Sequence, residues 1–169
     1  MNCINFTVPM NPCPCGYYPD RNKCRCTPYE VRNYLSHISG PILDRIDICV
    51  PVGKVEIGQL QSDRKGMGSE EMRTKVMRAR SRQERRYRGT DFRFNSELGP
   101  DEVEKYCALG EEEKIFLEKL FRAMDFSARS YHRLLKVART IADLADCEQI
   151  AKQHLQQAAC YRQGELFDK

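Results

Sequence analysis

Four cysteines stand close together near the amino terminus, in two Cys-x-Cys pairs, Cys13-Pro14-Cys15 and Cys24-Arg25-Cys26. Tetrahedral zinc prefers soft ligands, and a loop that carries two close pairs of thiolates can bring four of them to one point. Gly16 lets the chain reverse after the first pair. The pattern predicts a zinc knuckle over residues 13–26 with the ligands Cys13, Cys15, Cys24 and Cys26. Because four protein ligands leave no position for water, the predicted zinc is structural.

Disulfides or free thiols are the alternative interpretations of the same cysteines. Residues 1–16 hold no basic stretch followed by an apolar one, so they do not resemble a secretory signal. The thiols of such a chain are expected to stay reduced, and a disulfide within one Cys-x-Cys pair would be strained. We therefore favour zinc and expect a cytoplasmic protein.

A run of basic residues over 69–88 is a second candidate site, since eight basic side chains there accompany only three acidic ones. A narrow apolar seam with a spacing of three or four predicts one long helix: Met72, Val76, Ala79, Gln83 and Tyr87. The other face of this helix could follow phosphates, with Arg78, Arg82 and Arg85 as contacts to nucleic acid. The alternatives are a solvated helix, or one that pairs with the acidic segment 97–125, in the same subunit or in a neighbouring one.

The elements that must position these residues are mostly helices. Apolar periodicity predicts helices over 101–107, 111–124, 127–145 and 148–162, with Ser127 as a cap. Pro28 suits the first position of a helix that Thr27 caps. Two short apolar runs, 3–9 and 46–52, predict buried strands. The predicted fold is mainly α, with a C-terminal helical bundle.

Composition sets broad limits on the function. The 169 residues fit one domain of ordinary size, with or without a small appendage. A net charge of +4 neither requires nor excludes nucleic acid. No apolar run reaches the ~18 residues of a membrane-spanning helix, so no membrane partner is expected.

Three segments together resemble the magnesium-chelatase-like AAA+ ATPases of the ComM/YifB type. They are MNPCPCG at 10–16, ISGPILDRID at 38–47 and SARSYHRLLKVARTIADL at 127–144. The segments occur in the order found in the family, and the resemblance covers nearly the whole chain. It is weakest over 53–100.

The resemblance implies roles for three polar residues. Asn11 matches the sensor-1 asparagine that orients the attacking water, Arg45 the arginine finger offered to a neighbouring subunit's nucleotide, and Arg129 the sensor-2 arginine of the helical lid. A phosphoryl-transfer transition state spreads negative charge over oxygens, which a guanidinium stabilises well. From the residues alone, Arg45 could instead pair with Asp44 or Asp47, Arg129 could be solvated, and Asn11 could cap a turn.

The sequence contains no phosphate-binding loop and no acidic pair after a strand. The only Gly-Lys pair, Gly53-Lys54, is followed by Val55 rather than Ser or Thr. In the resembled family both elements lie upstream of the position that matches Met1. We therefore expect the chain to begin inside the ATPase domain and to be inactive alone, with ATP and magnesium bound by the full-length parent.

The resemblance also implies an organisation and an assembly. Residues 1–52 would be the C-terminal remnant of the α/β AAA+ core, 53–100 a connection with the basic helix, and 101–169 the helical lid. The implied function is ATP hydrolysis in a homo-hexameric ring that acts on DNA as a helicase or in branch migration.

Two other functions fit the residues without the resemblance. One is a stand-alone zinc-binding adaptor that contacts nucleic acid or a partner protein through the basic helix. The other is a structural helical module whose charged segments pair with each other.

Overall fold

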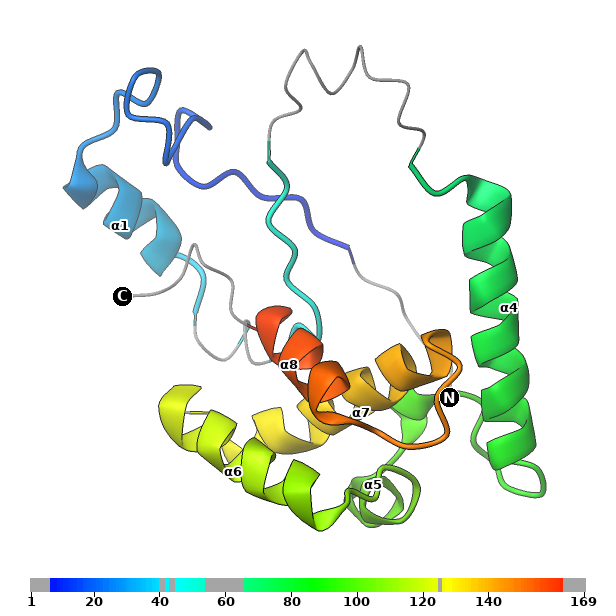
Figure 1. The fold of residues 1–169 in the computed structure, drawn as a ribbon. Coiled ribbons are helices and arrows are strands. Elements are labelled where there is room, and N and C mark those ends of the chain that lie inside the picture. The colour runs from blue at the N-terminus through cyan, green and yellow to red at the C-terminus, as the bar shows by residue number, and fades with distance from the viewer. Residues whose placement is uncertain (1–6, 40–41, 43–44, 54–65, 125, 163–169) are drawn as a thin grey trace. The chain divides into compact units, whose positions relative to one another are not determined.

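The computed structural model describes residues 7–39, 42, 45–53, 66–124 and 126–162 (Figure 1). All regular elements in this part of the chain are helical. They are α1 (Pro28–Ser36), α4 (Ser69–Arg86), the 3-10 turn η1 (Asn95–Glu97), α5 (Pro100–Tyr106), α6 (Glu111–Met124), α7 (Ala128–Leu144) and α8 (Lys152–Cys160). The prediction of a mainly α chain with a C-terminal helical bundle is therefore confirmed. Within the described residues, no helix is long and apolar enough to cross a membrane.

The predicted strand at 46–52 is wrong. These residues form no strand, and the side chains of Ile48, Val50 and Val52 are exposed. A strand is stabilised by hydrogen bonds to a neighbouring strand, and the described residues contain no such neighbour. The amide of Cys49 in this segment donates instead to the carbonyl of Tyr161, in the turn after α8. Of the other predicted strand, 3–9, residues 7–9 carry no strand and the rest lies outside the described residues.

The described residues belong to two compact units, one within Met1–Ile46 and the other formed by Asp47–Arg162. The basic helix and the lid helices belong to the second unit. The domain limits that the resemblance implies, at 52/53 and 100/101, stay a prediction.

The first unit consists of the cysteine loop and α1, and local signals in the sequence determine where α1 begins. Pro28 occupies the first turn, where its missing N–H costs no hydrogen bond. Thr27 and Glu30 form a capping box, in which each side chain accepts a hydrogen bond from the other residue's backbone amide. The amide and then the hydroxyl of Thr27 both donate to the Glu30 carboxylate, which lowers the pKa of Glu30. Among the described residues of this unit, only Cys13 and Val31 are buried.

In the second unit α7 is the central helix, and α4, η1, α5 and α8 all pack against it. Its apolar stripe is the one that the sequence predicts, and Ser127 caps it by accepting a hydrogen bond from the amide of Ser130. Leu134, Ala138 and Ala142 are completely buried. They join a continuous apolar core with residues from α5, α6 and α8. The helical bundle therefore has a core of its own.

Candidate metal centre and nucleotide-site residues

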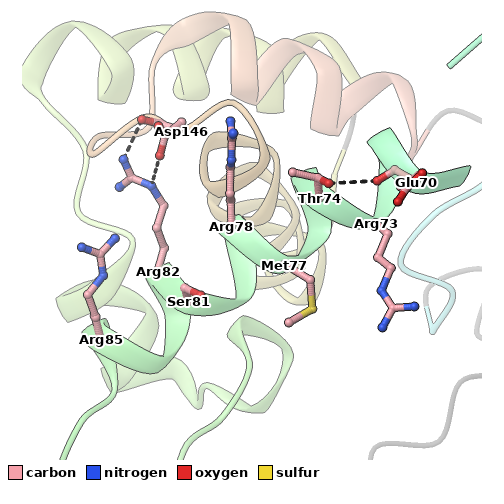
Figure 2. A pocket seen from close by; sticks show the side chains of 9 residues that line it. All are labelled: Glu70, Arg73, Thr74, Met77, Arg78, Ser81, Arg82, Arg85 and Asp146. Carbon is pink, nitrogen blue, oxygen red and sulfur yellow. Dashed lines mark hydrogen bonds and ion pairs between the residues drawn. The ribbon is translucent and has the colours of Figure 1, made fainter. Parts of the chain in front are cut away.

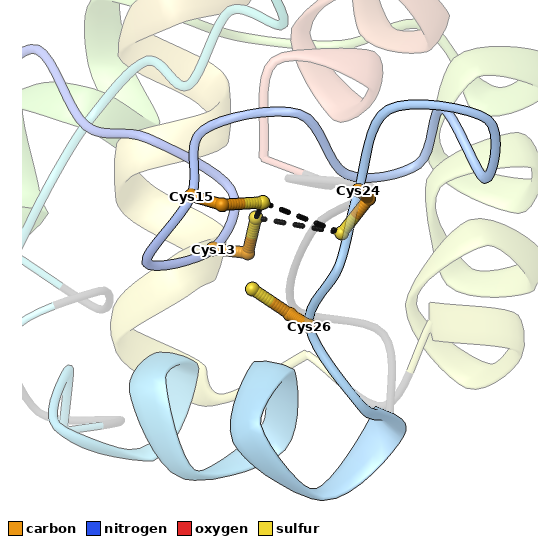
Figure 3. Close-up of side chains that lie close together, drawn as sticks. All are labelled: Cys13, Cys15, Cys24 and Cys26. Carbon is orange, nitrogen blue, oxygen red and sulfur yellow. Dashed lines mark hydrogen bonds between the residues drawn. The ribbon is translucent and has the colours of Figure 1, made fainter.

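The cysteine loop brings four thiols to one point (Figure 3). The sulfur atoms of Cys13, Cys15, Cys24 and Cys26 all lie within 4.8 Å of one another. The Sγ atom of Cys13 is 3.3 Å from that of Cys15 and 3.8 Å from that of Cys24, and the Sγ atoms of Cys15 and Cys24 are 3.6 Å apart. All four are free thiols at these separations rather than disulfides.

This donor set fits tetrahedral zinc. Four sulfurs at the ~2.3 Å Zn–S distance stand about 3.8 Å apart, close to the separations found here. The backbone amide of Tyr17 lowers the pKa of Cys15 to about 6, and that of Tyr18 donates to the sulfur of Cys13. Amide donors that stabilise thiolates are expected around a metal. The residues can therefore hold a zinc ion, whose chemistry would be structural.

Tight turns position the four sulfurs. The amide of Gly16 donates to the carbonyl of Cys13, and Gly16 has a φ of 78°, a left-handed conformation that glycine adopts without strain. Between the two pairs, the Asp20 carbonyl accepts hydrogen bonds from the amides of Lys23 and Cys24. The loop thus turns once after the first pair of cysteines and once again just before the second pair.

Asn11 and Arg45 belong to the same unit as the cysteines. A Cβ atom at Gly16 would lie 3.7 Å from the side chain of Asn11, so Asn11 sits directly over the first turn of the loop. Arg45 is exposed, and its amide donates to the carbonyl of Ile42. Asp47, one of the two acids considered as its partner, accepts a hydrogen bond from Arg133 at 3.0 Å. The other, Asp44, lies outside the described residues.

Arg129 is the second residue of α7 and belongs to the helical unit. Two further arginines lie at the first turns of the same helix, Arg133 within it and Arg162 against it. Arg133, one turn after Arg129, pairs with Asp47, and Arg162 donates to the hydroxyl of Ser130 at 3.0 Å. Neither Arg133 nor Arg162 was predicted from the sequence as a site residue. The i, i+4 spacing of Arg129 and Arg133 is the signal in the sequence that could have indicated Arg133.

Figure 2 shows the basic face of α4, where a groove of about 590 Å³ is lined by Arg73, Arg78, Arg82 and Arg85. Arg78 and Arg85 are exposed, as a contact to phosphate requires. Arg82 is held within the fold: its Nε lies 2.6 Å from Asp146 Oδ1, and its Nη2 donates to the Asp146 carbonyl. This ion pair lowers the pKa of Asp146.

A buried polar network joins the C-terminal end of α4 to α7. Arg86 donates to both carboxylate oxygens of Asp143, which is itself completely buried. The amide nitrogen of Asn95 donates to Asp143 at 3.0 Å, and its oxygen accepts from the hydroxyl of Tyr87 at 2.6 Å. Arg139 lies 3.2 Å from the same carboxylate. Two arginines and an amide thus satisfy one buried charge.

The basic helix does not pair with the acidic segment 97–125 in the ion pairs found among the described residues. Lys75 pairs with Glu71 inside α4, and Arg82 and Arg86 pair with Asp146 and Asp143. Acids of the segment pair elsewhere: Glu112 with Lys152, Glu111 with Lys114 and Glu118 with Arg122. Pairing between neighbouring subunits stays a hypothesis.

Two family models match the chain in order. The model described as magnesium chelatase, subunit ChlI, matches residues 3–60, and the model for the C-terminal region of that subunit matches residues 66–162. The chain belongs to the magnesium chelatase ChlI family. In this ChlI-family chain the first match contains Asn11, the cysteines and Arg45, and the second contains α4 and all the lid helices.

The chain is similar to three curated bacterial relatives over most of its length. It is 41% identical over 90% of its residues to the uncharacterized protein YifB of Salmonella typhimurium. It is 39% identical over 94% to the competence protein ComM of Haemophilus influenzae, and 39% identical over 94% to YifB of Escherichia coli. The chain spans only 29–31% of the length of these relatives. The ChlI family is of the AAA+ class, which implies the use of ATP and magnesium.

Proposed function

We propose that this chain is the C-terminal part of an AAA+ ring ATPase and completes nucleotide sites that upstream segments begin. The observation that carries the proposal is the paired family match, 3–60 followed by 66–162, which preserves the order of the core remnant and the lid. The names of the relatives state no reaction, so ATP hydrolysis and ring assembly are proposals for the parent of this chain.

Three residues have proposed roles in hydrolysis. Asn11 holds the attacking water, because an amide can accept and donate a hydrogen bond without taking the water's proton. Arg45 stabilises the charge that develops on the γ-phosphate bound by a neighbouring subunit. Arg129 contributes a second permanent charge from the lid.

The surroundings of these residues are compatible with the roles. Arg45 is exposed, as a residue that reaches into a neighbouring subunit must be. Arg129 lies in the first turn of α7, where the helix dipole also favours an anion. Asn11 lies over Gly16, so an ordered cysteine loop would fix its position. We therefore assign the zinc ion a structural role that extends to Asn11.

The proposed substrate of the parent ring is DNA, contacted through the basic face of α4. Arg78 and Arg85 are exposed on this face and make the proposed phosphate contacts. Arg82 is also proposed to lie along the nucleic acid, while its pairing with Asp146 offsets the charge of one of the two acidic residues that line the groove. The alternative function, a stand-alone zinc-binding adaptor, would use the same basic face of α4 to contact nucleic acid and would need no nucleotide.

The ATPase proposal is tested in a chimera in which this chain replaces the matching region of Haemophilus influenzae ComM. Arg45→Ala is expected to lower kcat by ~10³-fold or more and to leave KM nearly unchanged, because a finger acts on the transition state. Asn11→Ala and Arg129→Ala are expected to lower kcat as well. Arg32→Ala, an exposed arginine on α1, is the matched control and should have no effect. Full kcat in the Arg45→Ala chimera would refute the assignment.

The DNA contact is tested by the salt dependence of binding to single-stranded DNA. Replacing Arg78 and Arg85 by Gln removes two phosphate contacts, which should reduce the slope of log K against log salt by about 1.4. Lys119→Gln, on the exposed surface of α6, is the control and should leave the slope as it is. An unchanged slope in the double variant would contradict the proposed contact.

A further inference from the structure

The apolar seam of α4 extends beyond the part of the helix that is covered. Its C-terminal half is buried, with Ala79 at 4% and Tyr87 at 2% exposed. Its N-terminal half continues the same seam with Met72 and Val76, which are each 50% exposed. All residues from 66 to 78 are exposed. The fold therefore leaves one half of a continuous apolar stripe in solvent, as expected of a docking face.

A groove on the same unit has the complementary shape. It lies between α5, α6 and α7 and has a volume of about 670 Å³, enough for several side chains. Its floor is apolar and is formed by Val103, Cys107, Leu117, Phe121, Tyr131 and Leu135. The groove and the exposed half of α4 are open in the same molecule, so neither covers the other.

Charge favours contact between the two surfaces. Helix α4 holds seven basic and three acidic residues, a net charge of +4, whereas α5 and α6 together hold four basic and seven acidic residues, a net charge of −3. On a helical projection Arg73 and Lys75 flank the Met72–Val76 stripe on its two sides. Glu104 and Glu118 line the groove together with Lys114 and Arg122, so the lining itself is balanced and the attraction comes from the net negative charge of α5 and α6.

We propose that the Met72–Val76 stripe of one copy of this chain docks into the α5–α6–α7 groove of a second copy. An amphipathic helix laid into an apolar groove is a common mode of association, and the flanking charges would fix its orientation. The two surfaces differ, so the contact is heterologous. Each copy offers one stripe and one groove, and repetition of the contact builds a ring or an open chain.

This inference rests on the ring of the proposed function for its choice of a second copy as occupant. It requires neither nucleotide nor the upstream segments, so its failure and that of the ATPase proposal are distinguishable. Arg78 and Arg85 lie on the opposite side of α4 from the seam. Docking would therefore leave the proposed DNA face accessible.

The test is sedimentation of the purified 169-residue chain and of two classes of variant. The wild-type chain is expected to associate beyond a dimer as its concentration rises. Val76→Glu places a charge on the stripe, and Glu104→Arg with Glu118→Arg reverses the groove charges. Each should raise the dissociation constant by ~100-fold, because a buried charge lacks a partner or meets a like charge. All three positions are exposed, and circular dichroism verifies that each variant is folded.

Mixing the two variants gives the decisive result. One keeps an intact groove and the other an intact stripe, so an equimolar mixture should form heterodimers at concentrations at which neither variant associates alone. Met77→Glu, an exposed methionine outside the seam, and Asp101→Arg, outside the groove, are the controls and should associate like the wild type. A wild-type chain that stays monomeric, equal effects of Val76→Glu and Met77→Glu, or a mixture without heterodimer would each overturn the proposal.

Discussion

The two compact units are stabilised in different ways. In the cysteine-loop unit only Cys13 and Val31 are buried among the described residues, whereas the helical unit encloses a core of fourteen buried apolar side chains. A small unit without a core usually requires a metal or disulfides, and a bundle with a continuous core does not. We propose that a metal ion holds the first unit together, whereas apolar burial, completed by one buried polar network, holds the second.

Removal of the proposed zinc ion should produce the largest difference in stability between the two units. Structural zinc contributes roughly 10–16 kcal/mol to the folding of zinc-finger peptides, so a chelator or Cys24→Ser should unfold the loop and α1. The helices of the second unit should keep their amide protection. Hydrogen exchange of each helix, together with elemental analysis, measures both effects.

Cys160→Ser is the matched control for this prediction, because Cys160 is an exposed thiol of α8 outside the cluster. It should leave one zinc per chain. Undiminished protection of α1 in zinc-free protein would contradict the contrast between the units.

The next largest effect is expected from Asp143→Ala in the helical unit. The substitution leaves Arg86 and Arg139 without their buried carboxylate, a change that typically costs about 3–5 kcal/mol. Urea denaturation followed by the helical signal measures it. Asp101→Ala, at an exposed position of α5, should change the free energy of unfolding by less than ~0.5 kcal/mol. If the two variants lost equal stability, the network would not be what joins α4 to α7.

A smaller effect is expected from Thr27→Ala, which removes the side-chain cap of α1. Loss of an N-cap costs ~1 kcal/mol, and it should lower the protection of α1 in the zinc-loaded chain without affecting α7. Thr27→Ser keeps the hydroxyl and should retain most of the protection. Equal protection in the alanine and serine variants would show that the metal alone determines the stability of α1.

The smallest effect is a pH dependence confined to the helical unit. Burial, and then the charge of Arg139, lowers the pKa of His154 below 6.5, so the folded state favours the neutral ring. The corresponding stability is complete above the unfolded pKa of about 6.5 and is lost as the pH falls through the lower folded value. His154→Gln, which keeps an acceptor for the Ala151 amide, should flatten the free energy of unfolding between pH 7 and about 5.5.

Local patterns allowed most of the fold to be predicted from the sequence. The predicted helix 111–124 agrees with α6 at both ends, and Thr27 and Ser127 cap the helices that they were expected to cap. These features depend on neighbours within one turn. The predicted strand at 46–52 was wrong because an apolar run indicates burial but does not show whether a neighbouring strand is present to form hydrogen bonds with it.

The candidate site was predictable to a lesser degree. The sulfur cluster follows from two close pairs in one loop, so spacing alone was sufficient. The buried network was not predictable, because Arg86 and Asp143 stand 57 residues apart and only the packing of α4 on α7 brings them together. The same packing makes Arg82 a partner of Asp146, whereas the position of Arg82 on the basic face of the helix indicated only a phosphate contact.

The central claim, that Arg45 completes a nucleotide site on another subunit, is tested most directly by mixing two inactive rings. One ComM chimera carries Arg45→Ala, and the other keeps Arg45 but lacks the lysine of its upstream phosphate loop. Each alone should hydrolyse ATP at a background rate. In the mixture, Arg45 of the second chimera meets ATP bound by the first, so hydrolysis should return. A mixture that stays at background, although mixed rings form, would contradict the claim.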